Sequence, residues 1–150
     1  HISPKTISDV AFDQLQALGM TYRKAEYIKD FSTKILNRTF DLEAVKKMSN
    51  KDAIFALSQL KGIGVWTAEM ILLFCLQRLD IFSYDDLAIH RGLRMVYHHR
   101  QVNRSLFERY RRRFSPYGSV ASLYLWAVSG GAISNMKDFA PQKSHQTKGK

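Results

Sequence analysis

The chain has 150 residues, 45% of them apolar, and a net charge of +10 at pH 7. This length allows one domain with a substantial hydrophobic core. A single cysteine, Cys75, excludes a disulfide within the chain and any iron–sulfur cluster or zinc site held by several cysteines. No apolar run reaches about 18 residues, so the sequence predicts neither a membrane span nor a membrane partner.

Apolar residues recur at helical spacing almost throughout, and no useful alternating pattern predicts a strand. Thr21, Asp41 and Ser49 each stand where a polar side chain would cap a helix. We therefore expect an all-α fold, a helical bundle whose domain covers 1–130 and is followed by a polar, basic, loosely ordered tail over 131–150. The expected helices cover 10–18, 22–36, 41–48, 53–60, 65–77, 87–98, 105–114 and 119–128.

The positive charge is concentrated in the second half of the chain. Between Asp86 and Ser115 the only acids are Asp86 itself and Glu108. Arginine binds phosphate through two parallel hydrogen bonds, so this segment favours a nucleic-acid partner, although solvated helix faces would explain some of the cations. The arginines of this segment are Arg91, Arg94, Arg100, Arg104, Arg109, Arg111, Arg112 and Arg113.

The most informative stretch is 60–68, which reads LKGIGVWTA and joins an amphipathic helix to a very apolar one. Gly62 and Gly64 allow a sharp turn without side chains on its outer surface. The helix that follows begins at once, so its free N–H groups point out of the turn and form a site for an anion. In a basic protein the best anion is a DNA phosphate; the simpler alternative is an ordinary turn between two helices.

The pattern Leu-x-Gly-Ile-Gly-x-x-Thr-Ala between two helices resembles the helix-hairpin-helix motif of DNA glycosylases. The resemblance implies double-stranded DNA containing a damaged base as the partner. It also implies that carbonyl oxygens of the hairpin hold Na⁺ or K⁺ next to a phosphate. The implied DNA contacts are Gly62, Gly64, Val65, Thr67, Lys61 and Arg91. The implied ion ligands are the carbonyls of Ser58, Leu60 and Ile63.

A pair of acids, Asp85 and Asp86, precedes the next predicted helix. Taken alone, such a pair is most simply a helix cap. In the helix-hairpin-helix glycosylases the catalytic aspartate matches Asp86, and Asp85 is the weaker candidate. One carboxylate suffices for the chemistry, because it stabilises the positive charge that develops on the deoxyribose and orients the attacking water. The resemblance implies that no cofactor is required.

Position 66 separates two classes of these enzymes. Bifunctional members have a lysine there, whose amine attacks the sugar, whereas this chain has Trp66, which cannot act as such a nucleophile. We expect base removal without strand cleavage. The strings 61–70 and 115–126 resemble the alkylation-repair branch, that of 3-methyladenine DNA glycosylase II. There a tryptophan matching Trp126 lines the pocket for the flipped base, with Trp66 and Met70 as further candidates; core packing is the alternative for both tryptophans.

The resemblance extends from about residue 4 to residue 126, with departures at Val65, Ser83, Ala88 and Gly118. Family members carry a further helical segment before this point, so we expect a fragment that lacks the N-terminal part, exposes apolar helix faces, self-associates and lacks activity on its own.

The predicted function is that of a monofunctional DNA glycosylase, an N-glycosidic hydrolase that excises alkylated purines of the 3-methyladenine type in base excision repair. The alternative is a helix-hairpin-helix module that binds DNA without catalysis. The expected location is the cytoplasm of a bacterium or the nucleus of a eukaryote.

Overall fold

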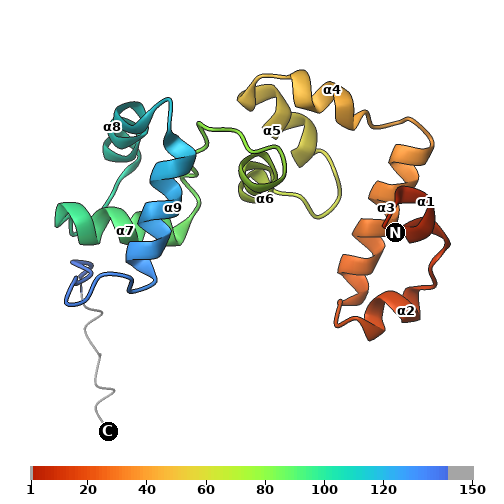
Figure 1. Ribbon diagram of the computed structural model, residues 1–150, viewed down its shortest axis with the longest axis horizontal. Coiled ribbons are helices and arrows are strands. Elements are labelled where there is room, and N and C mark those ends of the chain that lie inside the picture. Colours follow the sequence, from red (N-terminus) through yellow and green to blue (C-terminus); the bar gives the residue numbers. More distant parts are fainter. Residues whose placement is uncertain (1, 142–150) are drawn as a thin grey trace, which may run out of the picture. The chain divides into compact units, whose positions relative to one another are not determined.

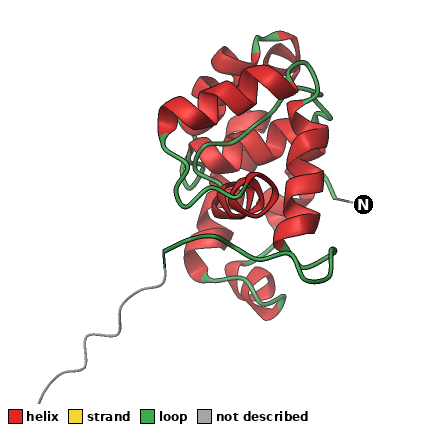
Figure 2. Ribbon diagram, turned by 90° about the vertical axis from the view of Figure 1, so that its left-hand side faces the viewer, coloured by secondary structure: helices red, strands yellow, loops and turns green. Residues whose placement is uncertain are grey.

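The computed structural model describes residues 2–141 and forms two compact units, His1–Leu76 and Gln77–Lys150. Helices joined by loops account for the fold, and no strand occurs over the described range (Figures 1 and 2). The all-α prediction is therefore confirmed. None of the described helices is long and apolar enough to span a bilayer.

The first unit contains six α-helices and one short π-helix. They are α1 (Pro4–Asp9), α2 (Phe12–Ala17), α3 (Tyr22–Leu36), α4 (Leu42–Lys47), α5 (Asn50–Ser58), α6 (Val65–Met70) and η1 (Ile71–Cys75). Helices α1 and α2 both pack against α3. The Lys29 ammonium of α3 donates to the carbonyls of Ser8 and Val10, so it satisfies carbonyl groups at the end of α1.

The second unit is built on three helices, α7 (Leu87–Tyr97), α8 (Arg104–Phe114) and α9 (Gly118–Ser129). Its core includes Ile89, Leu93, Phe107 and Leu125, each at most 5% exposed. Helix α9 packs across α7 (Figure 1). The two helices are closest at Gly92, where a Cβ atom would lie 2.6 Å from the Leu125 carbonyl oxygen. A side chain at position 92 would push the two helices apart.

Most predicted helix boundaries agree with the structure within two residues. The prediction of 22–36 coincides with α3, and Thr21, Asp41 and Ser49 accept the capping hydrogen bonds expected of them. The predicted helix over 10–18 is wrong at its start, because Val10 is extended (ψ 136°) and α2 begins only at Phe12. Helix α1 was not predicted, although Ser3 and Thr6 form a capping box that marks its start.

The predicted helix over 65–77 is α-helical only in its first part and continues as a π-helix. After α6 the backbone widens into η1, in which the Leu76 N–H donates to the Ile71 carbonyl at 3.0 Å. Gln77 then adopts a left-handed conformation (φ 52°) and ends the helix. A π-helical turn of this kind is rare in helices and is often found near functional sites.

The segment after α9 is held against α7. The Arg94 guanidinium donates to both carboxylate oxygens of Asp138, at 2.7 and 2.6 Å, and the rings of His98 and Phe139 lie 4.6 Å apart. The part of the predicted tail up to residue 141 therefore contacts the second unit, and 142–150 lies outside the described residues.

Candidate active site

The hairpin between α5 and α6 is a tight turn whose geometry needs glycine at one of its two glycine positions. Gly62 has φ +79°, a left-handed conformation, and the Ile63 N–H donates to the Leu60 carbonyl at 3.2 Å across the turn. Gly64 is the extended N-cap of α6 and has no side chain to cap the helix. The Ala68 N–H donates to the Gly64 carbonyl at 2.9 Å, so the helix begins directly after the turn, as predicted.

A tyrosine from α3 covers the hairpin from one side. A Cβ atom placed on Gly62 would lie only 2.1 Å from Cδ2 of Tyr27, so the ring lies directly against the glycine. Tyr27 and Gly62 line a hollow of about 240 Å³ together with Lys24 and Lys61. Sequence reasoning missed Tyr27, because nothing in the sequence signals that a residue so far upstream contacts the turn.

The other predicted hairpin residues mostly reach solvent. Lys61 and Gly64 are exposed, Val65 and Trp66 are about half exposed at 49% and 47%, and Thr67 is partly buried. The structure thus leaves the outer surface of the turn open for a partner. Met70, at the end of α6, is partly buried.

The expected ion ligands differ in their surroundings. Leu60 is buried, and its carbonyl accepts the hydrogen bond from Ile63 described above. A carbonyl oxygen has two lone pairs, so this bond leaves it able to coordinate a cation. Ser58 is the last residue of α5, where carbonyl groups lose their helical partners. Backbone carbonyl oxygens are ligands that suit hard cations. Among the described residues, no group of three or more His, Cys, Asp or Glu could hold a metal.

Asp86 is the N-cap of α7, and its carboxylate is fixed on the helix that follows. Its Oδ1 atom accepts hydrogen bonds from the backbone N–H groups of Ala88, at 2.9 Å, and Ile89, at 3.0 Å. The side chain is buried, with the residue 6% exposed, whereas Asp85 is exposed. The positive end of α7 therefore faces a carboxylate withdrawn from bulk water.

Trp126 on α9 holds the same carboxylate oxygen. Its indole N–H donates to Asp86 Oδ1 at 3.1 Å, and its ring packs against the core of the second unit. The structure therefore brings together two of the residues that the sequence singled out, 40 positions apart in the chain. Three N–H donors converge on one oxygen, which fixes the direction of the carboxylate before any substrate arrives.

Several predicted phosphate-binding arginines are engaged within the protein. Arg94 is bound to Asp138, and this hydrogen bond raises the pKa of Arg94 and lowers the pKa of Asp138. Arg91 lies 3.9 Å from the same carboxylate, with its side chain 53% exposed. Arg104 and Arg111 pair with Glu108 at 2.9 and 3.6 Å. The remaining exposed arginines of α8, which include Arg109, Arg112 and Arg113, keep that helix strongly basic.

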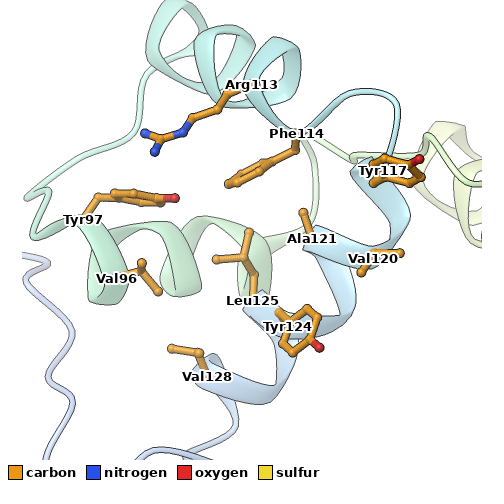
Figure 3. Close-up of a pocket in the computed structure, with 10 residues that line it drawn as sticks. All are labelled: Val96, Tyr97, Arg113, Phe114, Tyr117, Val120, Ala121, Tyr124, Leu125 and Val128. Carbon is orange, nitrogen blue, oxygen red and sulfur yellow. The ribbon is translucent and has the colours of Figure 1, made fainter.

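A separate hollow of about 420 Å³ lies among α7, α8 and α9 (Figure 3). Its lining is mainly apolar, and the guanidinium of Arg113 lies over the ring of Tyr97, 5.7 Å from its centre. Asp86 and Trp126 do not line this hollow. It is therefore distinct from the carboxylate site.

One departure from the family pattern has a structural reason. Gly118 donates its backbone N–H to Asp80 Oδ1 at 3.1 Å, and a Cβ atom there would lie 2.8 Å from the same oxygen. The Ser115 hydroxyl donates to the other oxygen of Asp80 at 2.6 Å. A larger side chain at 118 would displace Asp80, so the glycine secures the start of α9 in this chain.

Comparison with known proteins gives consistent matches. The profile described as "HhH-GPD superfamily base excision DNA repair protein" matches residues 1–116. DNA-3-methyladenine glycosylase 1 of Schizosaccharomyces pombe is 31% identical over 129 residues, which cover 85% of this chain and 57% of that protein. The putative DNA-3-methyladenine glycosylase YfjP of Bacillus subtilis is 32% identical, with coverage of 82% and 43%.

The fold agrees with a solved relative. The S. pombe 3-methyladenine DNA glycosylase, solved in complex with abasic DNA, superposes with a TM-score of 0.75 and 29% identity, over 88% of this chain and 64% of that one. The chain thus spans about half the length of the curated relatives it matches, 57% and 43% in the two cases above.

Proposed function

We propose, from the premise that this chain belongs to the HhH-GPD superfamily of base excision DNA repair proteins, that it acts as a monofunctional DNA glycosylase which releases alkylated purines of the 3-methyladenine type. Its partner is double-stranded DNA with a damaged base, in the compartment that holds the genome. The observation that supports this most directly is the buried Asp86 carboxylate, held by three N–H donors at the start of α7.

Asp86 supplies the chemistry in this proposal. As the glycosidic bond lengthens, positive charge develops on the deoxyribose, and a fixed anion stabilises it. A carboxylate withdrawn from bulk water acts through a lower effective dielectric, so its effect on the sugar is stronger than that of an exposed acid. Because three donors occupy Oδ1, no reorganisation is needed when the charge appears. The same carboxylate orients or deprotonates the attacking water.

Trp66 excludes strand cleavage in this proposal, and Trp126 favours a positively charged base. An indole at position 66 cannot form a Schiff base, so the abasic product is released without strand cleavage. The alkylated purine carries a positive charge, which favours an aromatic face over its plane and makes it a good leaving group. In this proposal Trp126 offers that face beside Asp86, and Trp66 and Met70 on α6 are further candidates for contact with the base.

The hairpin supplies binding that is independent of DNA sequence. The exposed turn at Gly62 and Gly64 offers backbone amides to a phosphate, with Val65 and Thr67 on the helix start and Lys61 beside it. Arg91 adds a second cation in the other unit. Na⁺ or K⁺ held by the carbonyls of Ser58, Leu60 and Ile63 would neutralise part of the phosphate charge.

The decisive experiment incubates the full-length protein that contains this chain with DNA methylated in vitro and identifies the released bases by chromatography. We expect 3-methyladenine release from the unmodified full-length protein and none from its Asp86→Asn variant, which keeps the cap and the shape but removes the charge. Asp85→Asn is the matched control, because that neighbouring carboxylate is exposed, and it should excise normally. Undiminished excision by Asp86→Asn would falsify the assignment.

The same experiment separates the alternative function. A module that only binds DNA would release no base in any form, yet would bind duplex with an affinity that falls steeply with salt. Base release together with nicked strands would instead contradict the monofunctional class, whatever Asp86 does.

A further inference from the structure

We infer that His90 is a positioning residue, which fixes the loop carrying Asp86 through a hydrogen bond to the backbone of Tyr84. This inference rests on the proposed function, since it concerns how the candidate catalytic carboxylate is held. His90 lies on α7 one helical turn after Asp86, the N-cap of that helix.

The hydrogen bond defines which nitrogen of the His90 imidazole carries a proton. His90 Nε2 lies 2.7 Å from the carbonyl oxygen of Tyr84. A carbonyl only accepts, so Nε2 must carry the proton and donate. The bond spans the two residues that precede α7 and ties the loop to the helix that it leads into.

His90 also holds Asp86 through its own backbone. Its N–H donates to the Asp86 carbonyl at 3.2 Å, the first helical hydrogen bond of α7. One residue therefore secures the chain at Tyr84 with its ring and at Asp86 with its amide. The short segment between these points, which includes Asp85, has little freedom to carry Asp86 away from its three donors.

Aromatic packing keeps the imidazole in the donating position. The ring stacks on the buried Phe107 of α8, with centres 5.3 Å apart and planes 18° from parallel. The Tyr84 ring meets it edge to face at 5.0 Å. The Arg104 guanidinium covers Tyr84 at 4.4 Å. The ring cannot turn away from the Tyr84 carbonyl without breaking these contacts.

Two substitutions separate the effect of the hydrogen bond from the effect of the ring packing. His90→Phe keeps a flat ring against Phe107 and removes the donor, whereas His90→Gln restores an N–H donor without the ring. The matched control is His99→Phe. His99 Nε2 lies 2.7 Å from the Tyr110 hydroxyl, and its ring packs on Tyr97 and Tyr110, so the same kinds of contact are lost away from Asp86.

The first readout is structural and needs no activity. The chain has two tryptophans, so a ¹H–¹⁵N spectrum contains two indole signals, and Trp66→Phe identifies that of Trp126. Asp86→Asn calibrates how far the Trp126 signal moves when its acceptor loses charge. We expect His90→Phe to shift or broaden this signal, His90→Gln to restore it in part, and His99→Phe to leave it in place.

The second readout is the single-turnover rate of base release. Loosening a reacting group by about 1 Å costs on the order of 100-fold in rate, so we expect His90→Phe to lose roughly 10- to 100-fold. The dissociation constant for undamaged duplex should not change. His99→Phe should keep the full rate, even where its melting temperature falls as far as that of His90→Phe.

The outcomes of the two proposals are distinguishable. Excision by Asp86→Asn overturns the proposed function, and the Trp126 signal still decides whether His90 positions the carboxylate. If Asp86→Asn is inactive but His90→Phe keeps both the rate and the Trp126 signal, the positioning role is refuted. Equal effects of His90→Phe and His99→Phe on both readouts refute the positioning role as well, because such effects would come from a general loss of stability.

Discussion

The two hairpin glycines look equivalent in the sequence but have opposite tolerances in the structure. Gly62 has φ +79° and would place a Cβ atom 2.1 Å from Cδ2 and 2.5 Å from Cε2 of Tyr27. Gly64 has φ −89°, and no atom lies within 4 Å of its hypothetical Cβ. We therefore predict that Gly62→Ala is strongly destabilising and that Gly64→Ala is nearly neutral.

The magnitude follows from two costs at Gly62. A left-handed conformation costs an L-residue about 1–2 kcal/mol. The overlap with the Tyr27 ring forces either the ring or the turn to move, and overpacking of this kind costs about 1–3 kcal/mol. Together they predict a loss of roughly 2–5 kcal/mol in the free energy of unfolding. At Gly64 only the weaker capping ability of alanine remains, under about 1 kcal/mol.

Urea denaturation followed by circular dichroism measures both variants. The double variant Tyr27→Ala/Gly62→Ala separates the two costs, because removal of the ring should leave only the backbone cost relative to Tyr27→Ala alone. Equal stabilities of Gly62→Ala and Gly64→Ala would refute the argument. A Gly62→Ala cost that Tyr27→Ala does not reduce would show that the ring contact has no part in it.

Three further predictions concern other parts of the fold. Gly92→Ala should lower the melting temperature, because the new Cβ atom would lie 2.6 Å from the Leu125 carbonyl oxygen. The overpacking cost of about 1–3 kcal/mol exceeds the roughly 1 kcal/mol that alanine gains in helix propensity. A higher melting temperature would contradict this. The Arg94 hydrogen bond lowers the pKa of Asp138. This pair therefore stabilises the fold fully above the unfolded pKa of about 3.9 and progressively less as pH falls through the lowered value. The free energies of unfolding of Asp138→Asn and of the unmodified protein, measured against pH, should converge at low pH. Borohydride should trap no covalent complex with DNA, because Trp66 offers no amine; a trapped complex would disprove the class.

The sequence predicted the parts of the fold that depend on local signals. Capping side chains and helical spacing fixed the bounds of α3, α4 and α7, because both act within a turn or two of the chain. The start of α2 and the π-helix at Ile71 could not be predicted from such local signals. Val10 is extended where its apolar spacing suits a helix, and η1 interrupts a run whose composition is uniformly apolar.

The candidate site shows the same division. Asp86 and Trp126 were found by resemblance, but the hydrogen bond between them depends on how α9 packs on α7, which spacing does not reveal. Tyr27 and His90 carried no signal, since each acts through a contact that exists only once distant segments meet. Asp138 likewise lay in a stretch whose polar composition predicts little structure, and its contact with Arg94 removes that arginine from the DNA-binding candidates.

The choice between a capping and a catalytic interpretation of Asp86 also changes once the structure is known. The side chain caps α7 through Ala88 and Ile89 and accepts from Trp126 with the same oxygen. Capping therefore does not compete with the proposed catalytic role, because the same hydrogen bonds that cap α7 fix the direction of the carboxylate. An alanine at this position would lose the cap, worth about 1 kcal/mol, together with the charge, and would confuse unfolding with loss of chemistry. Asparagine caps a helix as well as aspartate does, so only Asp86→Asn isolates the negative charge on which the proposed function depends.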